Sequence, residues 1–407
     1  MLAIVAAVLL MPVPAWVTTW AATPAPRWGK ELPPPFAVPE TLTDQTVRQI
    51  VRTSVGGQQL RIVISNEFGA RPLTIGAATI ALALNSSDIE PATLKSVTFG
   101  GKPSVVIPPG APIVSDAVDL ATQPLARLAV SLYFPQTTAI NSVHWDGIQT
   151  GYISARGDAT KDIHFAAAAT TGSRFFLSGL MVNATPGSTA VVIFGDSIGD
   201  GACSTRDANK RWPDHLAERF QAEGHPHVAV VNEAFSGNRV LTNGMGMNAL
   251  ARFDMSILRH PHISTIIMTM GLNDIGWPGR NSLTPAEPVP TADDIINGYG
   301  QVIERAHEHG IRVIMGTLTP FADALVGTPL SGYYTPEKDA IRRQVNAWIR
   351  TNKTADGLID FDKVLEDPQN PGHLRGVFAC ADHLHPNDAG YQAMANSVNL
   401  DLLVPAK

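Results

Sequence analysis

The hydrophobic pattern changes once along the chain, at Pro186 and Gly187, and this change limits what the chain can fold into. Before it, apolar and polar residues alternate in short runs interrupted by Gly and Pro, which is typical of antiparallel strands. After it, runs that are apolar throughout alternate with amphipathic segments, which is typical of a parallel sheet covered by helices on both faces. The 407 residues therefore predict two units, at 16–187 and 188–407.

The first unit contains many short strand candidates, of which four are clearest, at residues 60–64, 96–99, 127–134 and 175–182. Short strands at regular spacing with turn residues between them predict a β-sandwich. The segment Ser142-Val143-His144-Trp145-Asp146 has no catalytic spacing, and we interpret it as a core strand with a buried Trp. We expect this unit to be a structural partner that borders the substrate entrance.

The second unit alternates strands with helices. Strands are predicted at 190–194, 228–231, 263–270, 311–317 and 358–361, and helices around 212–220, at 249–259, 293–309 and 336–350, and from 387 on. This order predicts an α/β fold, a three-layer doubly wound domain in which ligands bind beyond the carboxyl ends of the strands. Functional residues are therefore expected directly after the strands.

Composition excludes several classes of function. Thirty basic and thirty-six acidic residues give a net charge of −6, so no excess positive charge is present to hold nucleic acid. No run after the N-terminus reaches the ~20 apolar residues of a membrane span. These features fix no oligomeric state.

The N-terminus resembles an export signal. An apolar run at residues 2–10 precedes Val13-Pro14-Ala15, whose small residues fit a cleavage site, so we predict a signal peptide over residues 1–15 and a periplasmic or secreted protein. No basic residue precedes the run, and an ordinary buried segment remains the alternative.

The first strand of the second unit ends in Gly195-Asp196-Ser197-Ile198-Gly199. Glycines on both sides allow a tight turn that presents the Ser197 hydroxyl at the start of a helix, where backbone N–H groups favour developing negative charge. That position suits a nucleophile. The alternatives are an ordinary turn and a phosphate-binding loop, although the full glycine patterns of nucleotide loops are absent.

Candidate oxyanion donors follow the next two strands. Gly237 and Asn273 could supply a backbone N–H and a side-chain amide, respectively. An isolated Asn in a loop is more commonly a turn former, which remains the alternative for each block alone.

Near the C-terminus, Asp382 lies three residues before His385. On one turn the carboxylate reaches the imidazole Nδ1, which fixes the tautomer so that Nε2 can take a serine proton. Metal binding through His383 and His385 is the alternative, but no matching ligand cluster occurs elsewhere, and we expect no metal.

Together these four ordered blocks resemble the SGNH, or GDSL-type, hydrolases. The resemblance implies that Ser197 is the nucleophile, His385 its base and Asp382 the orienting acid, with the Ser197 N–H, Gly237 and Asn273 as oxyanion donors. Further segments are similar to an exported bacterial subgroup with an N-terminal β-domain, at residues 16–20, 65–69, 211–214 and 346–350.

One residue departs from that subgroup, which usually has Thr where this chain has Gly199. The glycine also creates a match to the nucleophile elbow of α/β-hydrolases. Because Ser197 follows the first strand of its unit and the acid is three residues from the histidine, the SGNH interpretation is favoured.

The resemblance implies a serine ester hydrolase that works through an acyl-enzyme without a cofactor. We expect short acyl esters as substrates, including acetylated carbohydrates, because no long apolar lid is evident. Trp277 and the Pro-rich loop at 277–290 either line an acyl or sugar pocket or simply cover the domain. A carbohydrate-binding protein with an inactive hydrolase domain, an acyltransferase and a lipase are the alternatives.

The two cysteines flank the predicted triad. Cys203 lies six residues after Ser197 and Cys380 five before His385, so a working triad brings the thiols near one another. We predict a disulfide between them, with buried free thiols as the alternative.

Overall fold

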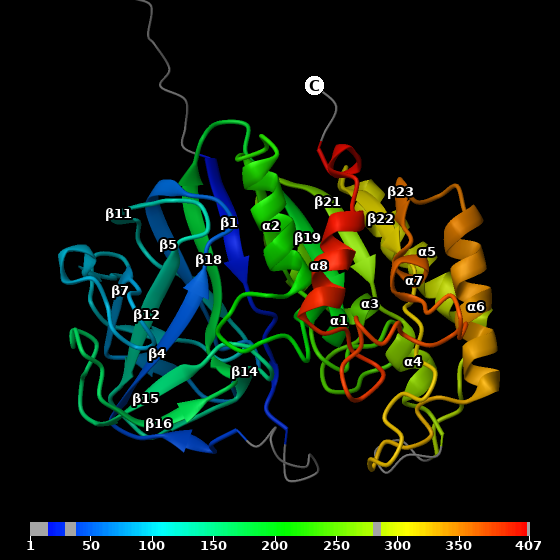
Figure 1. The fold of residues 1–407 in the computed structure, drawn as a ribbon. Helices are drawn as coiled ribbons and strands as arrows, with labels where there is room; N and C mark the ends of the chain where they lie inside the picture. Colours follow the sequence, from blue (N-terminus) through cyan, green and yellow to red (C-terminus); the bar gives the residue numbers. More distant parts are fainter. Residues whose placement is uncertain (1–14, 29–37, 280–285, 405–407) are drawn as a thin grey trace, which may run out of the picture.

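The computed structural model describes residues 15–28, 38–279 and 286–404. Strand pairing is antiparallel up to Ala184 and parallel from Thr189 on, so the two kinds of sheet follow one another along the chain (Figure 1). Residues 1–14 of the predicted signal peptide lie outside the described residues, and so does part of the Pro-rich loop, at 280–285.

Two larger antiparallel sheets form the β-region, which we define as residues 15–184. One has the order β1-β18-β5-β10, with β11 also paired to β5, and the other the order β16-β15-β4-β12-β7-β8. Their bounds are β1 (Ala15–Ala21), β18 (Leu177–Ala184), β5 (Gly57–Ser65), β10 (Pro112–Val114), β11 (Val118–Thr122), β16 (Ala167–Thr171), β15 (Gly151–Arg156), β4 (Gln45–Arg52), β12 (Arg127–Phe134), β7 (Ala77–Leu82) and β8 (Lys95–Ser96). Shorter strands pair beside them, namely β2 (Ala25–Pro26), β3 (Thr41–Leu42), β6 (Leu73–Ile75), β9 (Val105–Ile107), β13 (Thr138–Ala139), β14 (Ser142–His144) and β17 (Arg174–Phe175), and one 3₁₀ turn spans Pro91–Thr93.

Two of the four predicted strands of the β-region differ from the structure. The strand predicted at 175–182 is broken at Phe176, whose φ of 60° is left-handed, so the chain forms β17 and β18 instead of one strand. The strand predicted at 96–99 is reduced to β8, and beyond it Phe99 forms only an isolated bridge to Lys102 across a turn. The strand predicted at 127–134 is confirmed as β12, and β5 contains the strand predicted at 60–64.

The parallel sheet has the order β20-β19-β21-β22-β23. Its bounds are β19 (Thr189–Gly195), β20 (Val228–Asn232), β21 (Ile263–Thr269), β22 (Arg312–Gly316) and β23 (Gly357–Ile359), within two residues of the predicted strands. The chain leaves β19 for one neighbour, β20, and then crosses to the other, β21. The carboxyl end of β19 is therefore the topological switch point, where such sheets bind ligands.

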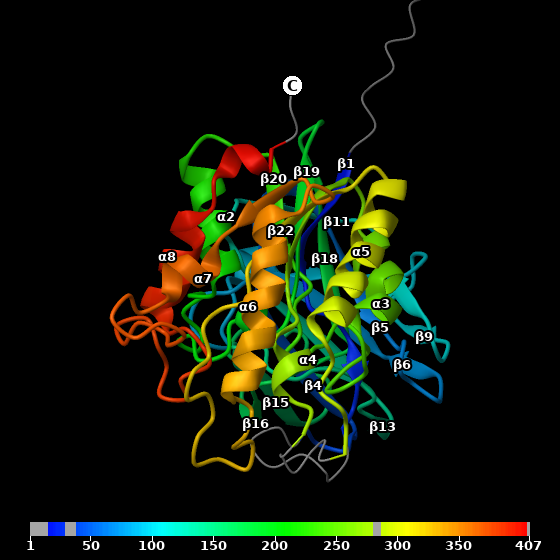
Figure 2. The ribbon, with the colours of Figure 1, turned by 90° about the vertical axis from the view of Figure 1, so that its right-hand side faces the viewer.

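Helices lie on both sides of this sheet. Figure 2 shows α2, α7 and α8 on one side of the strands and α3 and α5 on the other. The helices are α1 (Ser197–Asp200), α2 (Trp212–Ala222), α3 (Ala249–Phe253), α4 (Leu272–Gly276), α5 (Ala292–Glu308), α6 (Pro336–Thr351), α7 (Phe361–Leu365) and α8 (Asp388–Ser397), with a π-helical turn over Asp254–Leu258 and a 3₁₀ turn over Leu400–Leu402. Within the described residues, no helix combines the length and the apolar character that crossing a membrane requires.

Strand β1 joins the two parts of the molecule, since it pairs with β18 and also packs against β19 and β20 (Figure 1). At this contact the buried His260 joins the two parts: its Nδ1 lies 3.1 Å from Thr18 Oγ1 of β1, and its Nε2 lies 2.8 Å from Glu233 Oε1 of its own part. Burial would raise the pKa of Glu233, but His260 and other partners outweigh it and lower that pKa.

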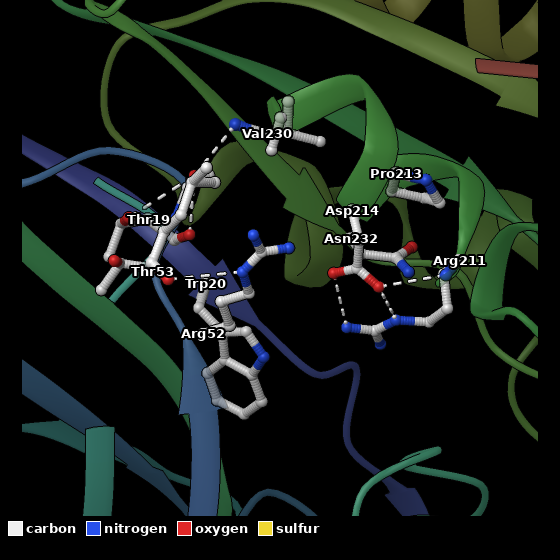
Figure 3. A pocket seen from close by; sticks show the side chains of 12 residues that line it. Thr19, Trp20, Arg52, Thr53, Arg211, Pro213, Asp214, Val230 and Asn232 are labelled. Carbon is white, nitrogen blue, oxygen red and sulfur yellow. Dashed lines mark hydrogen bonds and ion pairs between the residues drawn. The ribbon is translucent and has the colours of Figure 1, made fainter. Parts of the chain in front are cut away.

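A small polar cavity of about 30 Å³ lies at the same contact. Figure 3 shows Thr19, Arg52 and other side chains of the β-region facing Asp214 and Asn232 of the parallel-sheet part across it. This is room for about one water molecule.

Candidate active site

Ser197 is the first residue of α1, directly after β19. The Asp196 carboxylate caps this short helix by accepting from the Ile198 N–H at 3.0 Å, and Gly201 ends it with a φ of 94°. Burial raises the pKa of Asp196 to about 7. The capped turn holds the Ser197 hydroxyl at the switch point of the sheet.

The structure brings Ser197, His385 and Asp382 together in one chain of hydrogen bonds. Ser197 Oγ lies 2.8 Å from His385 Nε2, and His385 Nδ1 lies 2.6 Å from Asp382 Oδ2. The other carboxylate oxygen, Oδ1, accepts from the backbone N–H groups of Leu384 and His385, each at 3.0 Å. The loop that carries the histidine therefore fixes its acid as well.

Asp382 is held as an anion. Burial would raise its pKa, but the hydrogen bond and charge of His385, with the two backbone donors, lower that pKa to about 2. An ionised carboxylate only accepts, so Nδ1 of His385 carries a proton and Nε2 can receive one from the Ser197 hydroxyl.

The Asn273 amide is oriented by two donors. Its Oδ1 accepts from Trp277 Nε1 at 2.9 Å and from the Tyr333 hydroxyl at 2.8 Å, and its Nδ2 donates to the Asn238 carbonyl at 3.0 Å. Because an indole N–H can only donate, these contacts fix which end of the amide is the donor. The second Nδ2 proton thus has a defined direction.

Gly237 lies in a tight turn closed by a 3.0 Å hydrogen bond from the Asn238 N–H to the Phe235 carbonyl. Its φ of 75° favours glycine, and an added Cβ would lie 2.2 Å from Met245 Sδ. The Met245 carbonyl in turn accepts from Trp28 Nε1 of the β-region. We call this turn, residues 235–238, the oxyanion turn. The β-region therefore contacts the segment that packs against the oxyanion turn.

The two cysteines form a disulfide, with Cα atoms 6.4 Å apart and a sequence separation of 177. Two residues further on, the Thr205 hydroxyl and N–H donate to the Asp388 carboxylate at 2.6 and 2.8 Å. The disulfide and the Thr205–Asp388 hydrogen bonds thus both connect the loop after α1 to the segment around His385.

Trp277 is 6% exposed, and its ring N–H supports Asn273, while the Arg239 guanidinium lies 5.8 Å from the ring centre. Its expected contact with substrate stays a prediction. His383 is exposed with a φ of 57°, and both ring nitrogens of His385 face the triad partners, so the two histidines do not form a ligand pair. Cys203, Cys380 and Asp382 also cluster, but the two sulfurs are bonded to each other.

Sequence reasoning missed Tyr333. It lies 60 residues beyond Asn273, in a segment with no motif, and no pattern in the sequence ties it to the amide that it orients.

A serine, histidine and aspartate linked in this way at the switch point of a parallel sheet define a serine hydrolase in its general geometry. Residues 193–393 match the model of the GDSL-like lipase/acylhydrolase family, and the α/β part of the chain belongs to that family. The protein is a carboxylic ester hydrolase.

Solved structures also resemble this chain. A lipolytic protein of the G-D-S-L family from Desulfitobacterium hafniense is 20% identical, with a TM-score of 0.38 over 52% of this chain and 97% of that one. The esterase EstA from a Pseudoalteromonas species is 14% identical, with a TM-score of 0.37 over 52% and 94%. The acetyl xylan esterase AlAXEase is 18% identical, with a TM-score of 0.36 over 51% and 96%. No curated protein matches the sequence.

Gly199 is packed too tightly for a side chain. An added Cβ would lie 2.7 Å from the Cβ of Ala234, so we expect Gly199→Ala to lower the free energy of unfolding by ~1–3 kcal/mol and to reduce kcat, because the shift displaces the turn next to Ser197. Adding Ala234→Gly should restore both. Thermal unfolding and ester turnover measure this, and a stable, fully active single variant would contradict it.

The disulfide is expected to stabilise the fold. For a loop of 177 residues the chain-entropy model gives roughly 5 kcal/mol, so Cys203→Ser/Cys380→Ser should unfold at a markedly lower temperature. Mass spectrometry of unreduced, alkylated wild-type protein is the companion measurement. Two labelled thiols in the native protein would show that the bond is absent.

Proposed function

We propose that this hydrolase is a serine esterase acting on short acyl esters, with acetylated carbohydrate as a substrate class. The observation that carries the proposal is the continuous hydrogen-bonded chain from Ser197 Oγ through His385 to Asp382. The short-acyl preference is supported by the sequence, which contains no long apolar lid segment.

In the acylation step, Ser197 Oγ attacks the ester carbonyl carbon while its proton passes to His385 Nε2. The resulting imidazolium is stabilised by the Asp382 anion. When the tetrahedral intermediate collapses, the bond to the leaving alkoxide breaks and His385 returns the proton to that oxygen. Water then attacks the acyl-serine with the same histidine as base, releasing the acid and restoring the hydroxyl.

The oxyanion of that intermediate would be met by the Ser197 N–H, the Gly237 N–H and Asn273 Nδ2. The first lies at the start of α1, where unpaired helix N–H groups point outward. The third is held by Trp277 and Tyr333, so it loses little conformational freedom when charge develops.

We further infer that the two antiparallel sheets form a sandwich, that the parallel sheet with its helices is a three-layer doubly wound domain, and that the boundary falls between residues 187 and 188. The change in strand pairing between Ala184 and Thr189 supports that boundary. Export remains a proposal supported by the N-terminal residues, and the disulfide is of the kind that oxidising compartments favour.

Ser197→Ala is expected to remove nearly all esterase activity and leave the fold intact, because the hydroxyl forms the covalent bond to the acyl group and its removal causes little strain. The assay is hydrolysis of p-nitrophenyl esters from acetate to dodecanoate, together with acetate release from acetylated xylan oligosaccharides. A variant with wild-type kcat would refute the nucleophile. A wild-type preference for the longest chains would refute the short-acyl substrate.

Asn273→Ala should lower kcat by ~10²-fold with KM little changed, because the amide acts on charge that develops in the transition state. Tyr333→Phe is the matched control, since it removes one of the two donors that orient the amide and keeps the amide itself; its loss should be smaller. An effect of Asn273→Ala confined to KM would instead make Asn273 a residue that binds the ground-state substrate.

A further inference from the structure

The β-region contributes a buried histidine next to the active site. His144 ends β14 and is 5% exposed. Its Nδ1 lies 3.0 Å from the Thr23 carbonyl oxygen, and its Nε2 lies 2.9 Å from Oδ1 of Asp200, the last residue of α1. Its ring also meets the Phe235 ring edge to face at 5.5 Å. The side chain is therefore enclosed by the β-region, the nucleophile helix and the segment after β20.

The partners of His144 decide its protonation. A carbonyl oxygen only accepts a hydrogen bond, and so does an ionised carboxylate, so both ring nitrogens must carry protons to satisfy both contacts. Burial would lower the pKa of His144, but the charge and hydrogen bond of Asp200 outweigh it and raise that pKa. The two contacts and the raised pKa both favour the protonated imidazole, which is buried beside Asp200 between the two parts of the chain.

Asp200 also binds the residue before Gly237 in the oxyanion turn. Its other oxygen, Oδ2, accepts from the N–H of Ser236 at 3.0 Å and from the Ser236 hydroxyl at 2.9 Å. Asp200 lies three residues after Ser197 on one helical turn, and Ser236 immediately precedes Gly237. One carboxylate therefore connects the nucleophile turn to the oxyanion turn, and the β-region supplies the histidine that is hydrogen-bonded to it.

Neighbouring contacts tie the same two surfaces together. The Asp207 carboxylate, in the loop after α1, accepts from the Thr150 hydroxyl at 2.7 Å. Arg174 is also buried nearby, but its guanidinium donates to the Ile50 carbonyl and lies over the Trp20 ring. Within the described residues, His144 is thus the basic side chain that is hydrogen-bonded to Asp200.

We propose that His144 is a positioning residue for the esterase reaction: through Asp200 and Ser236 it sets the distance between the Ser197 hydroxyl and the Gly237 N–H. The proposal rests on the proposed function. It assigns the β-region a part in catalysis that requires no contact with substrate. Small displacements of reacting groups lower the reaction rate strongly. We therefore expect the loss of His144 to lower kcat and to leave KM little changed.

The test compares His144→Phe with His260→Phe. Both replace a buried histidine that is hydrogen-bonded to a carboxylate, and both lie at the contact between the two parts of the chain. His144 binds Asp200 across that contact, whereas His260 binds Glu233 within its own part and reaches across only to Thr18. The Glu233 side chain is hydrogen-bonded to His260 and Thr23 and not to the nucleophile or oxyanion turns. Active sites are counted by labelling with a fluorophosphonate, and kcat is expressed per labelled site. We expect both variants to unfold at lower temperature, and only His144→Phe to lose ~10-fold or more in kcat at little-changed KM.

Two milder variants cover the case in which His144→Phe fails to fold. His144→Gln keeps one donor for Asp200, and Ser236→Ala removes one hydroxyl from the far end of the bridge. Each should show a smaller loss of kcat, again without a matching change in KM. Wild-type kcat per labelled site in all folded His144 and Ser236 variants would overturn the proposal, and so would equal losses in the His144 and His260 variants.

A readout independent of turnover separates this proposal from the proposed function. Hydrogen–deuterium exchange at residues 197–201 and 234–238 should be faster in the His144 variants than in wild type or His260→Phe, and unchanged exchange there would overturn the positioning role. If the wild-type protein neither reacts with the fluorophosphonate nor cleaves any ester, the proposed function fails, and exchange still decides whether His144 holds the two turns.

Discussion

The parallel sheet imposes the constraint on which the site depends. Because β19, β20 and β21 run in the same direction, the segments that follow them all begin at one edge, and the switch in connection after β19 leaves space there. Ser197, Gly237 and Asn273 occupy these three segments. The last helix, α8, brings the preceding loop with His385 to the same edge. Residues spread over almost 190 positions thereby meet within hydrogen-bonding distance.

The carboxylates around this edge differ in pKa, because their surroundings differ. Burial raises the pKa of Asp274 to about 6, even though its oxygens accept from the backbone N–H groups of Val240 and Leu241. Asp382 is less deeply buried and has a histidine beside it, so its pKa falls to about 2. The acid that must stay ionised during catalysis is thus the one that accepts a hydrogen bond from a histidine on one oxygen and from two backbone N–H groups on the other.

The sequence predicted what depends on local pattern. Continuous apolar runs located all five parallel strands, and the short spacing of Asp382 and His385 predicted their contact, because three residues on one turn leave few geometries. Prediction failed where a single backbone angle determines whether a strand continues. At Phe176 the left-handed φ divides an apolar run that predicts one strand. Prediction also failed for Tyr333 and His144, since each meets its partner across a tertiary contact that no spacing encodes. The segment around His144 was interpreted as core strand, and it is one, but its buried side chain also binds the nucleophile helix.

The placement of β1 bears on the order in which the chain can assemble. Its hydrogen-bonding partner, β18, is the last strand of the β-region, so the sheet that contains both cannot close until the chain has been synthesised as far as Ala184. Thr18 of β1 then contacts His260, and Thr23, just after β1, contacts Glu233 and His144, which lie on either side of the boundary. Domains of a growing chain generally fold from the N-terminus onward. If the β-region folds first, the His144 side chain and the Thr23 carbonyl that orients it are in place before Ser197 and Asp200 have been synthesised.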